Sequence, residues 1–229
     1  MLHAPIPAAE AASLPLGSST PPAASILAAA ERILSHLEQG RTVDAAMLRS
    51  AMEDAFGASD TAGAWDWKAA YDACEVATVL FLRKYGKPLF RKAASPASRL
   101  SALVKIVGLL PTHTRRSEEA QAFQQFSTPI PLGLVAAHAA AITPADRVLE
   151  PSAGTGLFAI FAEIAGGALV LNELADTRAS LLSLLFPAIT VTCFDAAQID
   201  DHLDPAVTPS VVLMNPPFSA MANVEGRIA

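Results

Sequence analysis

The sequence predicts an α/β protein in which a parallel sheet follows a small all-α helical domain. The first observation is a series of amphipathic segments with helical spacing and short connections over residues 25–111. The second is a change after residue 112, where short apolar runs alternate with helical segments. Alternation of this kind is typical of βαβ units with right-handed crossovers. We therefore expect a helical domain at 25–111 and a sheet domain at 112–229.

The amino-terminal part is expected to begin with a disordered lead-in, residues 1–24, in which prolines are spread among Ala and Ser. A first helix is predicted from Ile26, and it stops near Gly40. Thr42 is expected to cap a second helix, which ends at Gly57.

Two further helices are predicted in this part. Asp66 is expected to cap a long third helix that ends near Gly86. A fourth helix is expected to begin at Ser95, with Pro96 in its first turn, and to stop at Pro111. Its inward face is expected to carry Leu100, Leu103, Val104, Val107 and Leu110.

The sheet is expected to contain four parallel strands. The last is the run Val211–Met214, whose continuous hydrophobicity indicates a strand buried on both faces. A helix over about Thr177–Leu185 is expected ahead of the third strand. The first three strands are predicted at Arg147–Glu150, Ala168–Glu173 and Ile189–Cys193.

Composition narrows the class of protein. No apolar run reaches the roughly 18 to 20 residues that a membrane span needs, and the N-terminus lacks the features of a signal peptide. Cys74 and Cys193 are expected in a buried helix and a buried strand, where they form neither a disulfide framework nor a metal site. These features predict a cytoplasmic protein without membrane association.

Positive charge is concentrated in one segment, although the formal net charge is −6. Residues 83–116 contain nine of the sixteen Lys and Arg residues and no acid. Such a stripe suits the phosphate backbone of a nucleic acid. A solvated helix face followed by a basic linker is the alternative. The nine residues are Arg83, Lys84, Lys87, Arg91, Lys92, Arg99, Lys105, Arg115 and Arg116.

The fourth strand leads into Asn215-Pro216-Pro217-Phe218. Neither proline can donate a backbone hydrogen bond, so the strand must end there, at the sheet edge where open α/β proteins bind ligands. The Asn215 amide and the Pro216 carbonyl are two acceptors for an exocyclic amino group, and Phe218 is a ring for the attached base to stack on. A strand-ending turn without chemistry is the alternative.

The first strand leads into a glycine turn that begins with an acid. Gly154 and Gly156 allow a ligand to lie against bare backbone, with a helix N-terminus behind it. The third glycine of a dinucleotide fingerprint and the Lys of a phosphate loop are both missing. Glu150 would repel a pyrophosphate and suits a cation, such as the sulfonium and ammonium groups of S-adenosylmethionine. The turn comprises Glu150, Pro151, Ser152, Ala153, Gly154, Thr155 and Gly156.

Acids also end the second and third predicted strands. Glu173 can accept hydrogen bonds from both ribose hydroxyls of a cofactor, the role of an acid at this place in nucleotide-binding βαβ units. Asp195, which precedes Ala196, can accept the adenine amino group. A solvated acid and a helix cap are the respective alternatives, but repetition over three strands favours a site.

Taken in order, these motifs resemble the gamma-type N6-adenine DNA methyltransferases. The resemblance implies a class I (Rossmann-like) methyltransferase fold, S-adenosylmethionine as cofactor, and Thr128 and Pro129 closing over the methionine end of that cofactor. The motifs that carry it are Phe126-Ser127-Thr128-Pro129, Glu150 to Gly156, Glu173, Asp195 and Asn215 to Phe218. The implied catalytic residues are Asn215, Pro216, Pro217 and Phe218. The implied cofactor-binding residues are Thr128, Pro129, Glu150, Pro151, Ser152, Ala153, Gly154, Thr155, Gly156, Glu173, Asp195 and Ala196.

A narrower resemblance lies in two further stretches, at residues 65–71 and 125–129. Trp65-Asp66-Trp67-Lys68-Ala69-Ala70-Tyr71 and Gln125-Phe126-Ser127-Thr128-Pro129 are similar to the amino-terminal region of bacterial strawberry notch-like proteins. Those are long chains in which a methyltransferase-like domain precedes a superfamily 2 helicase. The resemblance to the gamma-type methyltransferases implies adenine N6 in DNA as the target. Protein glutamine methylation and a catalytically inactive docking module are the alternatives.

The resemblance also implies a seven-stranded sheet, whereas only four strands are predicted. The sheet is therefore expected to be truncated after the fourth strand, with further strands or a helicase region supplied in cis or in trans. An open edge along Val211–Met214 would present unpaired N–H and C=O groups, so self-association of the chain is expected, with little or no methyl transfer by the chain on its own.

Overall fold

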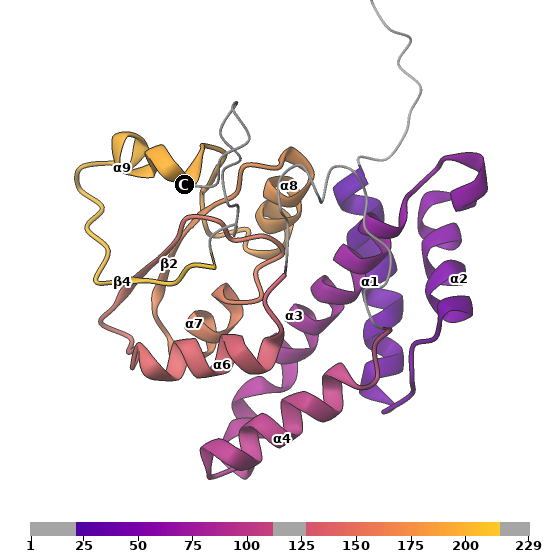
Figure 1. Cartoon of the computed structure of the whole chain (residues 1–229), viewed down its shortest axis with the longest axis horizontal. Helices are drawn as coiled ribbons and strands as arrows, with labels where there is room; N and C mark the ends of the chain where they lie inside the picture. The colour runs from indigo at the N-terminus through magenta and orange to yellow at the C-terminus, as the bar shows by residue number, and fades with distance from the viewer. Residues whose placement is uncertain (1–21, 112–126, 216–229) are drawn as a thin grey trace, which may run out of the picture.

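The structure, a computed structural model, describes residues 22–111 and 127–215 and shows an α/β protein with a four-stranded parallel sheet (Figure 1). Helices α1 to α4 lie on one side of the molecule, and the sheet with α6 to α9 lies on the other (Figure 1). Several residues of the sequence analysis lie outside the described residues: the lead-in up to residue 21, Arg115, Arg116, Gln125, Phe126, Pro216, Pro217 and Phe218.

The four helices predicted in the amino-terminal part are present. They are α1 (Pro22–Glu38), α2 (Ala45–Phe56), α3 (Trp67–Lys92) and α4 (Pro96–Val107), with a 3₁₀ turn, η1 (Asp60–Ala62), between α2 and α3. The Asp66 side chain accepts from the Ala69 N–H and caps α3, as predicted. Ser95 forms a capping box with Ser98 at the start of α4. Gly57 ends α2 in the left-handed conformation, at φ 76°.

Two helix starts differ from the prediction. Helix α1 begins at Pro22, within the stretch expected to be disordered, because proline suits the first helical turn. Helix α2 is capped by Asp44, whose carboxylate accepts from the Met47 N–H at 2.8 Å, and Thr42 lies outside it. Both residue types make good caps, so the sequence alone left the choice of start open.

The end of α3 was predicted too early. The helix continues through Gly86 to Lys92, although Pro88 lies inside it. A Cβ on Gly86 would lie 2.6 Å from Cδ1 of Ile164, so the glycine allows α3 to approach helix α7 (Ala159–Ala165) closely. Gly86 therefore marks a packing contact and not a helix end.

The buried face of α4 also differs from the prediction. Leu103 and Ile106 are buried, whereas Val104 and Val107 are exposed. The helix ends at Val107, before the predicted stop at Pro111. Helical spacing identified two apolar stripes, and the contact of α4 with α6 (Ile130–Ala139) decided which one is covered.

The sheet has the order β3-β2-β1-β4, and every pair is parallel. The strands are β1 (Arg147–Glu150), β2 (Ala168–Asn172), β3 (Val191–Thr192) and β4 (Val211–Val212). Register pairs Val148 with both Leu169 and Val211, so these three side chains share one face. That face packs against α6, α7 and α8 (Asp176–Leu185).

Strand β4 is not buried on both faces as expected. Leu213, just after it, is buried beneath Phe158 and Ala162, whereas Val212 and Met214 are each 52% exposed. Between β3 and β4 the described chain has only η2 (Ala196–Gln198) and the short α9 (Ile199–His202). Within the described residues β4 pairs with β1 alone, so it forms an edge of the sheet.

One hydrophobic core joins the helical part to the sheet. Helix α1 packs on α3 and α8, α3 on α7, and α4 on α6. The buried side chains of these helices and of β2 form a single cluster. Arg83 of α3 also binds Glu163 of α7 through two hydrogen bonds of 2.8 Å. The boundary at residue 111 thus divides two stretches of sequence that share a core.

The two cysteines have different environments. Cys74 is buried in α3, and burial, with Glu75 next to it, raises the pKa of its thiol. Cys193 was expected in a buried strand but is exposed, because β3 ends at Thr192. Both thiols are free. Of the helices described over 22–111 and 127–215, none has the length and apolar character required to cross a membrane.

The corrected face of α4 predicts unequal effects of two neighbouring truncations. Leu103→Ala should lower the free energy of unfolding by about 2–5 kcal/mol, since it leaves a cavity in the core. Val104→Ala, on the exposed side, should change it by less than about 0.5 kcal/mol. Urea denaturation measures both, and equal losses would contradict the observed orientation of α4.

Candidate functional site

The glycine turn lies at the carboxyl edge of the sheet, between β1 and α7. Gly154 and Gly156 have φ values of 57° and 89°, which other residues rarely adopt. A Cβ on Gly156 would also lie 2.8 Å from Cε2 of Phe186. The turn is largely covered: Ser152 and Gly154 are partly exposed, and Pro151, Ala153, Thr155 and Gly156 are buried.

Glu173 holds the turn against the end of β2. Its Oε2 accepts from the Gly154 N–H at 2.7 Å, and its Oε1 accepts from the Ala175 N–H at 3.0 Å. The Ala153 N–H donates to the Asn172 carbonyl at 2.9 Å. The structure therefore places Glu173 in the predicted site, where it binds the glycine turn. Its contact with a ribose stays a prediction.

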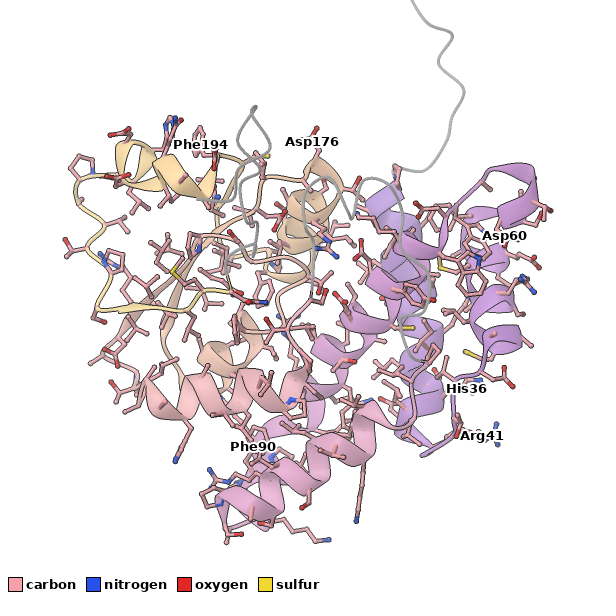
Figure 2. The ribbon with its side chains drawn as sticks, viewed as in Figure 1. His36, Arg41, Asp60, Phe90, Asp176 and Phe194 are labelled. Atoms are coloured by element: carbon pink, nitrogen blue, oxygen red, sulfur yellow. The ribbon has the colours of Figure 1, made fainter. Side chains whose placement is uncertain are left out.

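Asn172, which the sequence analysis did not single out, joins three strand ends. Its Nδ2 donates to the Pro151 and Phe194 carbonyls, each at 2.8 Å. Its Oδ1 accepts from the Thr192 hydroxyl at 2.8 Å and from the Phe194 N–H at 2.9 Å. Phe194, labelled in Figure 2, in turn stacks on His202 of α9, with ring centroids 4.0 Å apart. A polar residue in an apolar strand was the only sequence signal for this role.

Glu150 is a buried carboxylate without full pairing. Burial raises the pKa of Glu150 well above its ordinary value and nearby Glu173 raises it further, while the Ala159 backbone N–H lowers it in part. Among residues 22–111 and 127–215, none is a hydrogen-bond partner for its Oε2. A buried carboxylate in this state is costly, and a positive charge beside it would relieve the cost. Glu150 is thus suited to a positively charged partner, and its contact with S-adenosylmethionine stays a prediction.

Asn215 and Thr128 are brought into contact from opposite ends of the sheet part. Leu213 donates its N–H to the Leu149 carbonyl at 2.9 Å, so the chain leaves the sheet beside the glycine turn. Two residues further on, Asn215 Nδ2 donates to Thr128 Oγ1 at 3.0 Å. Pro129 follows Thr128 at the N-cap position of α6. The structure therefore brings into contact one residue from each of two motifs that the sequence analysis placed in one site.

Asp195 has the role that the sequence analysis gave as its alternative. It is exposed, and its carboxylate accepts from the Ala197 N–H at 3.0 Å, capping η2. Ala196 begins this 3₁₀ turn and is partly buried. Neither residue is joined to Glu150 or Glu173 by a described hydrogen bond. A contact of Asp195 with adenine stays a prediction.

Helix α3 contributes polar residues that the sequence analysis missed, since it assigned no chemistry to the helical part. Glu75 Oε2 accepts from the Thr155 hydroxyl of the glycine turn at 2.7 Å. Asp72 Oδ1 accepts from Arg178 Nη2 of α8 at 2.7 Å, and Lys68 lies 3.4 Å from Asp72 Oδ2. Acids recurring within an apolar helix were the available signal.

The Arg178 charge is held inside the protein by surrounding acids. Burial alone would lower the pKa of Arg178, but the carboxylates of Asp72, Glu75 and Glu173 together raise it above its ordinary value. The guanidinium is therefore a fixed positive charge behind the glycine turn. It links α3 to α8, and its Nη1 lies 3.9 Å from the position that a Cβ on Gly154 would take.

No protein-family model, curated protein or solved structure matches this chain. The assignment of the site therefore depends on its geometry alone. That geometry comprises a glycine turn, a buried unpaired carboxylate, and an amide bound to a threonine, all at the carboxyl edge of a parallel sheet.

The buried ion pair of α3 and α8 predicts a large loss on truncation. Asp72→Ala should lower the free energy of unfolding by about 3–5 kcal/mol, because it leaves the buried Arg178 guanidinium without the carboxylate that accepts its hydrogen bonds. The matched control is Asp54→Ala, which breaks an exposed pair with Arg32 and should cost at most about 1 kcal/mol. Urea denaturation at pH 7 measures both. A loss below 1 kcal/mol for Asp72→Ala would contradict this role.

The raised pKa of Glu150 predicts a characteristic pH dependence of stability. The folded state holds the Glu150 proton to higher pH than the unfolded state, whose value is near 4.5, so stability falls as pH rises through the folded pKa. Glu150→Gln should remove that fall and raise the free energy of unfolding at pH 8 by about 1–3 kcal/mol. Urea titrations of both proteins between pH 4 and 8 test this. Parallel pH profiles would show that Glu150 keeps an ordinary pKa.

Proposed function

We propose that this chain belongs to a methyltransferase domain that uses S-adenosylmethionine to methylate the N6 amino group of adenine in DNA, as part of a larger methylase and helicase protein. The contact of Asn215 with Thr128 beside the glycine turn is the observation that carries the proposal. It unites the two motifs that would hold the target amino group and the methionine end of the cofactor.

Three residues of the chain would bind the cofactor. Glu150 would hold its cationic end, where a partner for Oε2 is lacking in the structure. Thr128 would lie over the methionine part, and Glu173 would reach the ribose from its place beneath Gly154. The cofactor supplies a methyl group already activated by its bond to a positively charged sulfur.

The Asn215 amide would act on the adenine amino group, which is a poor nucleophile because its lone pair is delocalised into the ring. Donation from Nδ2 to Thr128 holds the Asn215 amide in one orientation. The acceptor atom of that amide is Oδ1. Oδ1 and the Pro216 carbonyl would accept the two N–H groups and stabilise the positive charge that develops on nitrogen. A new N–C bond forms, the S–C bond breaks, and the nitrogen then releases a proton to solvent. A duplex adenine must be flipped out to reach these groups, and Phe218 would stack on it.

A second candidate function, a catalytically inactive docking module, is favoured by the state of the glycine turn. The Gly154 N–H and the Thr155 hydroxyl are both bonded to acids of the chain itself, Glu173 and Glu75. A turn whose donors are already satisfied can be a stable platform without a cofactor. The two candidates differ in one measurable property, which is methyl transfer.

The proposed function is tested by incubating the larger methylase and helicase protein proposed to contain this chain with isotopically labelled S-adenosylmethionine and adenine-containing DNA. We expect N6-methyladenine by mass spectrometry of the digested DNA. Asn215→Ala should reduce its formation about 10²–10³-fold, as expected on loss of a preorganised charge-stabilising group. Gln39→Ala, which removes an exposed amide after α1, is the matched control and should retain activity.

Calorimetric measurement of S-adenosylmethionine binding by the Asn215→Ala and Glu150→Gln variants separates the two candidate functions. Asn215→Ala should bind S-adenosylmethionine as the wild type does, whereas Glu150→Gln should bind it more weakly because the charge of the cofactor loses its partner. Cofactor binding without any methylated product would favour the docking module. Absence of both binding and product would contradict the proposed methyltransferase and would leave the docking module, whose glycine turn is stable without a cofactor.

A further inference from the structure

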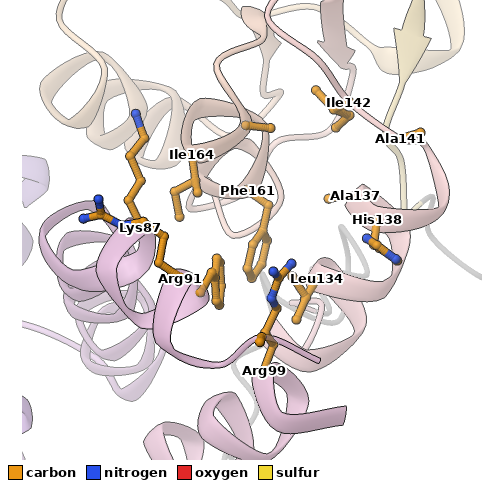
Figure 3. Close-up of a pocket in the computed structure, with 13 residues that line it drawn as sticks. Lys87, Arg91, Arg99, Leu134, Ala137, His138, Ala141, Ile142, Phe161 and Ile164 are labelled. Atoms are coloured by element: carbon orange, nitrogen blue, oxygen red, sulfur yellow. The ribbon is translucent and has the colours of Figure 1, made fainter. Parts of the chain in front are cut away.

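A pocket lies where the end of α3 and the start of α4 meet α6 and α7 (Figure 3). Its volume is about 710 Å³. Its floor is apolar: Phe90 and Leu134 are partly exposed there, whereas Phe161 is only 3% exposed, and none of the lining residues is acidic. Its rim carries Lys87, Arg91, Arg99 and His138.

The apolar floor of this pocket is built by close packing of α6 on α7. A Cβ on Gly133 would lie 2.9 Å from Cε2 of Phe161, so the glycine makes room for that ring beneath α6. Phe161 then stacks on Phe90 of α3, with centroids 6.3 Å apart and planes 19° apart. Figure 3 shows Phe161 at the centre of the pocket, with Leu134 and Ile164 around it.

The rim carries positive charge that the chain leaves uncompensated. Lys87 and Arg91 are exposed and lie one helical turn apart on α3, and neither has an ion pair among the residues described. Arg99 donates from Nε to the Ala93 carbonyl at 2.9 Å, and its guanidinium lies 5.9 Å from the Phe90 ring centroid. This bond positions Arg99 over the aromatic floor.

Glu163 of α7, which is next in sequence to the pocket residue Ile164, does not neutralise the basic rim. It is bound by Arg83 through two hydrogen bonds of 2.8 Å. Lys84 is similarly occupied by Glu38 at 2.6 Å. The basic stripe of the sequence is therefore divided by the fold: some of its members hold helices together, and Lys87, Arg91 and Arg99 surround a pocket.

The pocket is separate from the candidate methyl-transfer site. Thr128 stands at the start of α6, at the carboxyl edge of the sheet, whereas His138 is near the end of the same helix. The helix of 10 residues places the two about 15 Å apart. The pocket thus lies toward the amino edge of the strands.

We propose that this pocket binds one unpaired nucleotide of a single-stranded nucleic acid. Its base and sugar would lie on the apolar floor, and the flanking phosphates would lie on Lys87, Arg91 and Arg99. Aromatic floors with basic borders are the usual means of binding single strands, and guanidinium groups match phosphate geometry. A duplex keeps its bases stacked inside and offers only phosphates, so it cannot fill the pocket.

Fluorescence anisotropy with a labelled single-stranded oligodeoxynucleotide, without cofactor, tests the rim. The double variant K87Q/R91Q should make the negative slope of log K against log salt shallower by about 1.4 and weaken binding about 25-fold at 0.1 M salt, if each lost contact acts through counterion release. K92Q/K105Q removes two exposed charges of the same segment outside the pocket and should bind nearly as the wild type does. Equal losses in both would overturn the proposal.

The floor and the source of the nucleotide need separate measurements. Ala94 is exposed and lines the pocket, so Ala94→Leu should fill part of it, weakening binding without changing the salt slope. Unchanged binding would mean that only phosphates touch the rim, and it would overturn the proposal. Equal affinity for a duplex of the same length, or for free dAMP, would overturn it as well. The binding experiment contains no S-adenosylmethionine, so a negative result would not bear on the proposed methyl transfer. Likewise, absence of methyl transfer would not bear on nucleotide binding in this pocket.

Discussion

The contact of α3 with the glycine turn is the constraint on which the rest of the structure depends. Asp72 is paired with Arg178, and Glu75 accepts from Thr155, all of them buried. Taking any one of these groups out of water alone would be costly, so α3, α8 and the turn are stable only when they meet in a single arrangement. Helix α1 packs on both α3 and α8 and covers this arrangement. The helical part is therefore a wall of the candidate site.

The three buried acids near the glycine turn differ in their hydrogen bonding. Glu75 and Glu173 each accept hydrogen bonds from the glycine turn. Glu150 Oε2 has no such donor, and burial raises the pKa of its carboxyl. A fold that satisfies neighbouring acids but not this one is suited to a cationic ligand at this place. The proposed cofactor has that charge, and the proposed function makes use of it.

Features that depend on neighbours in the sequence were predicted well. The caps Asp66 and Ser95 and the helix end at Gly57 are confirmed, because each is made by hydrogen bonds or backbone angles within a few residues. Parallel strands were predictable from the alternation of apolar runs with helices. The end of α3 was wrong, because Gly86 serves a contact with Ile164, which is distant in the sequence.

The sequence by itself determined the α/β class, the four strand positions and the motifs that meet at the carboxyl edge. A parallel sheet brings the ends of its strands to one edge, so the glycine turn and Asn215 could be expected near each other. The place of Thr128, which follows no strand, was implied only by the resemblance, and the structure shows its hydrogen bond with Asn215. Only the tertiary structure decided that α3 binds the glycine turn and that Lys87 and Arg91 border a pocket. These depend on which helix faces meet, and amphipathic spacing shows that a face is covered without showing what covers it.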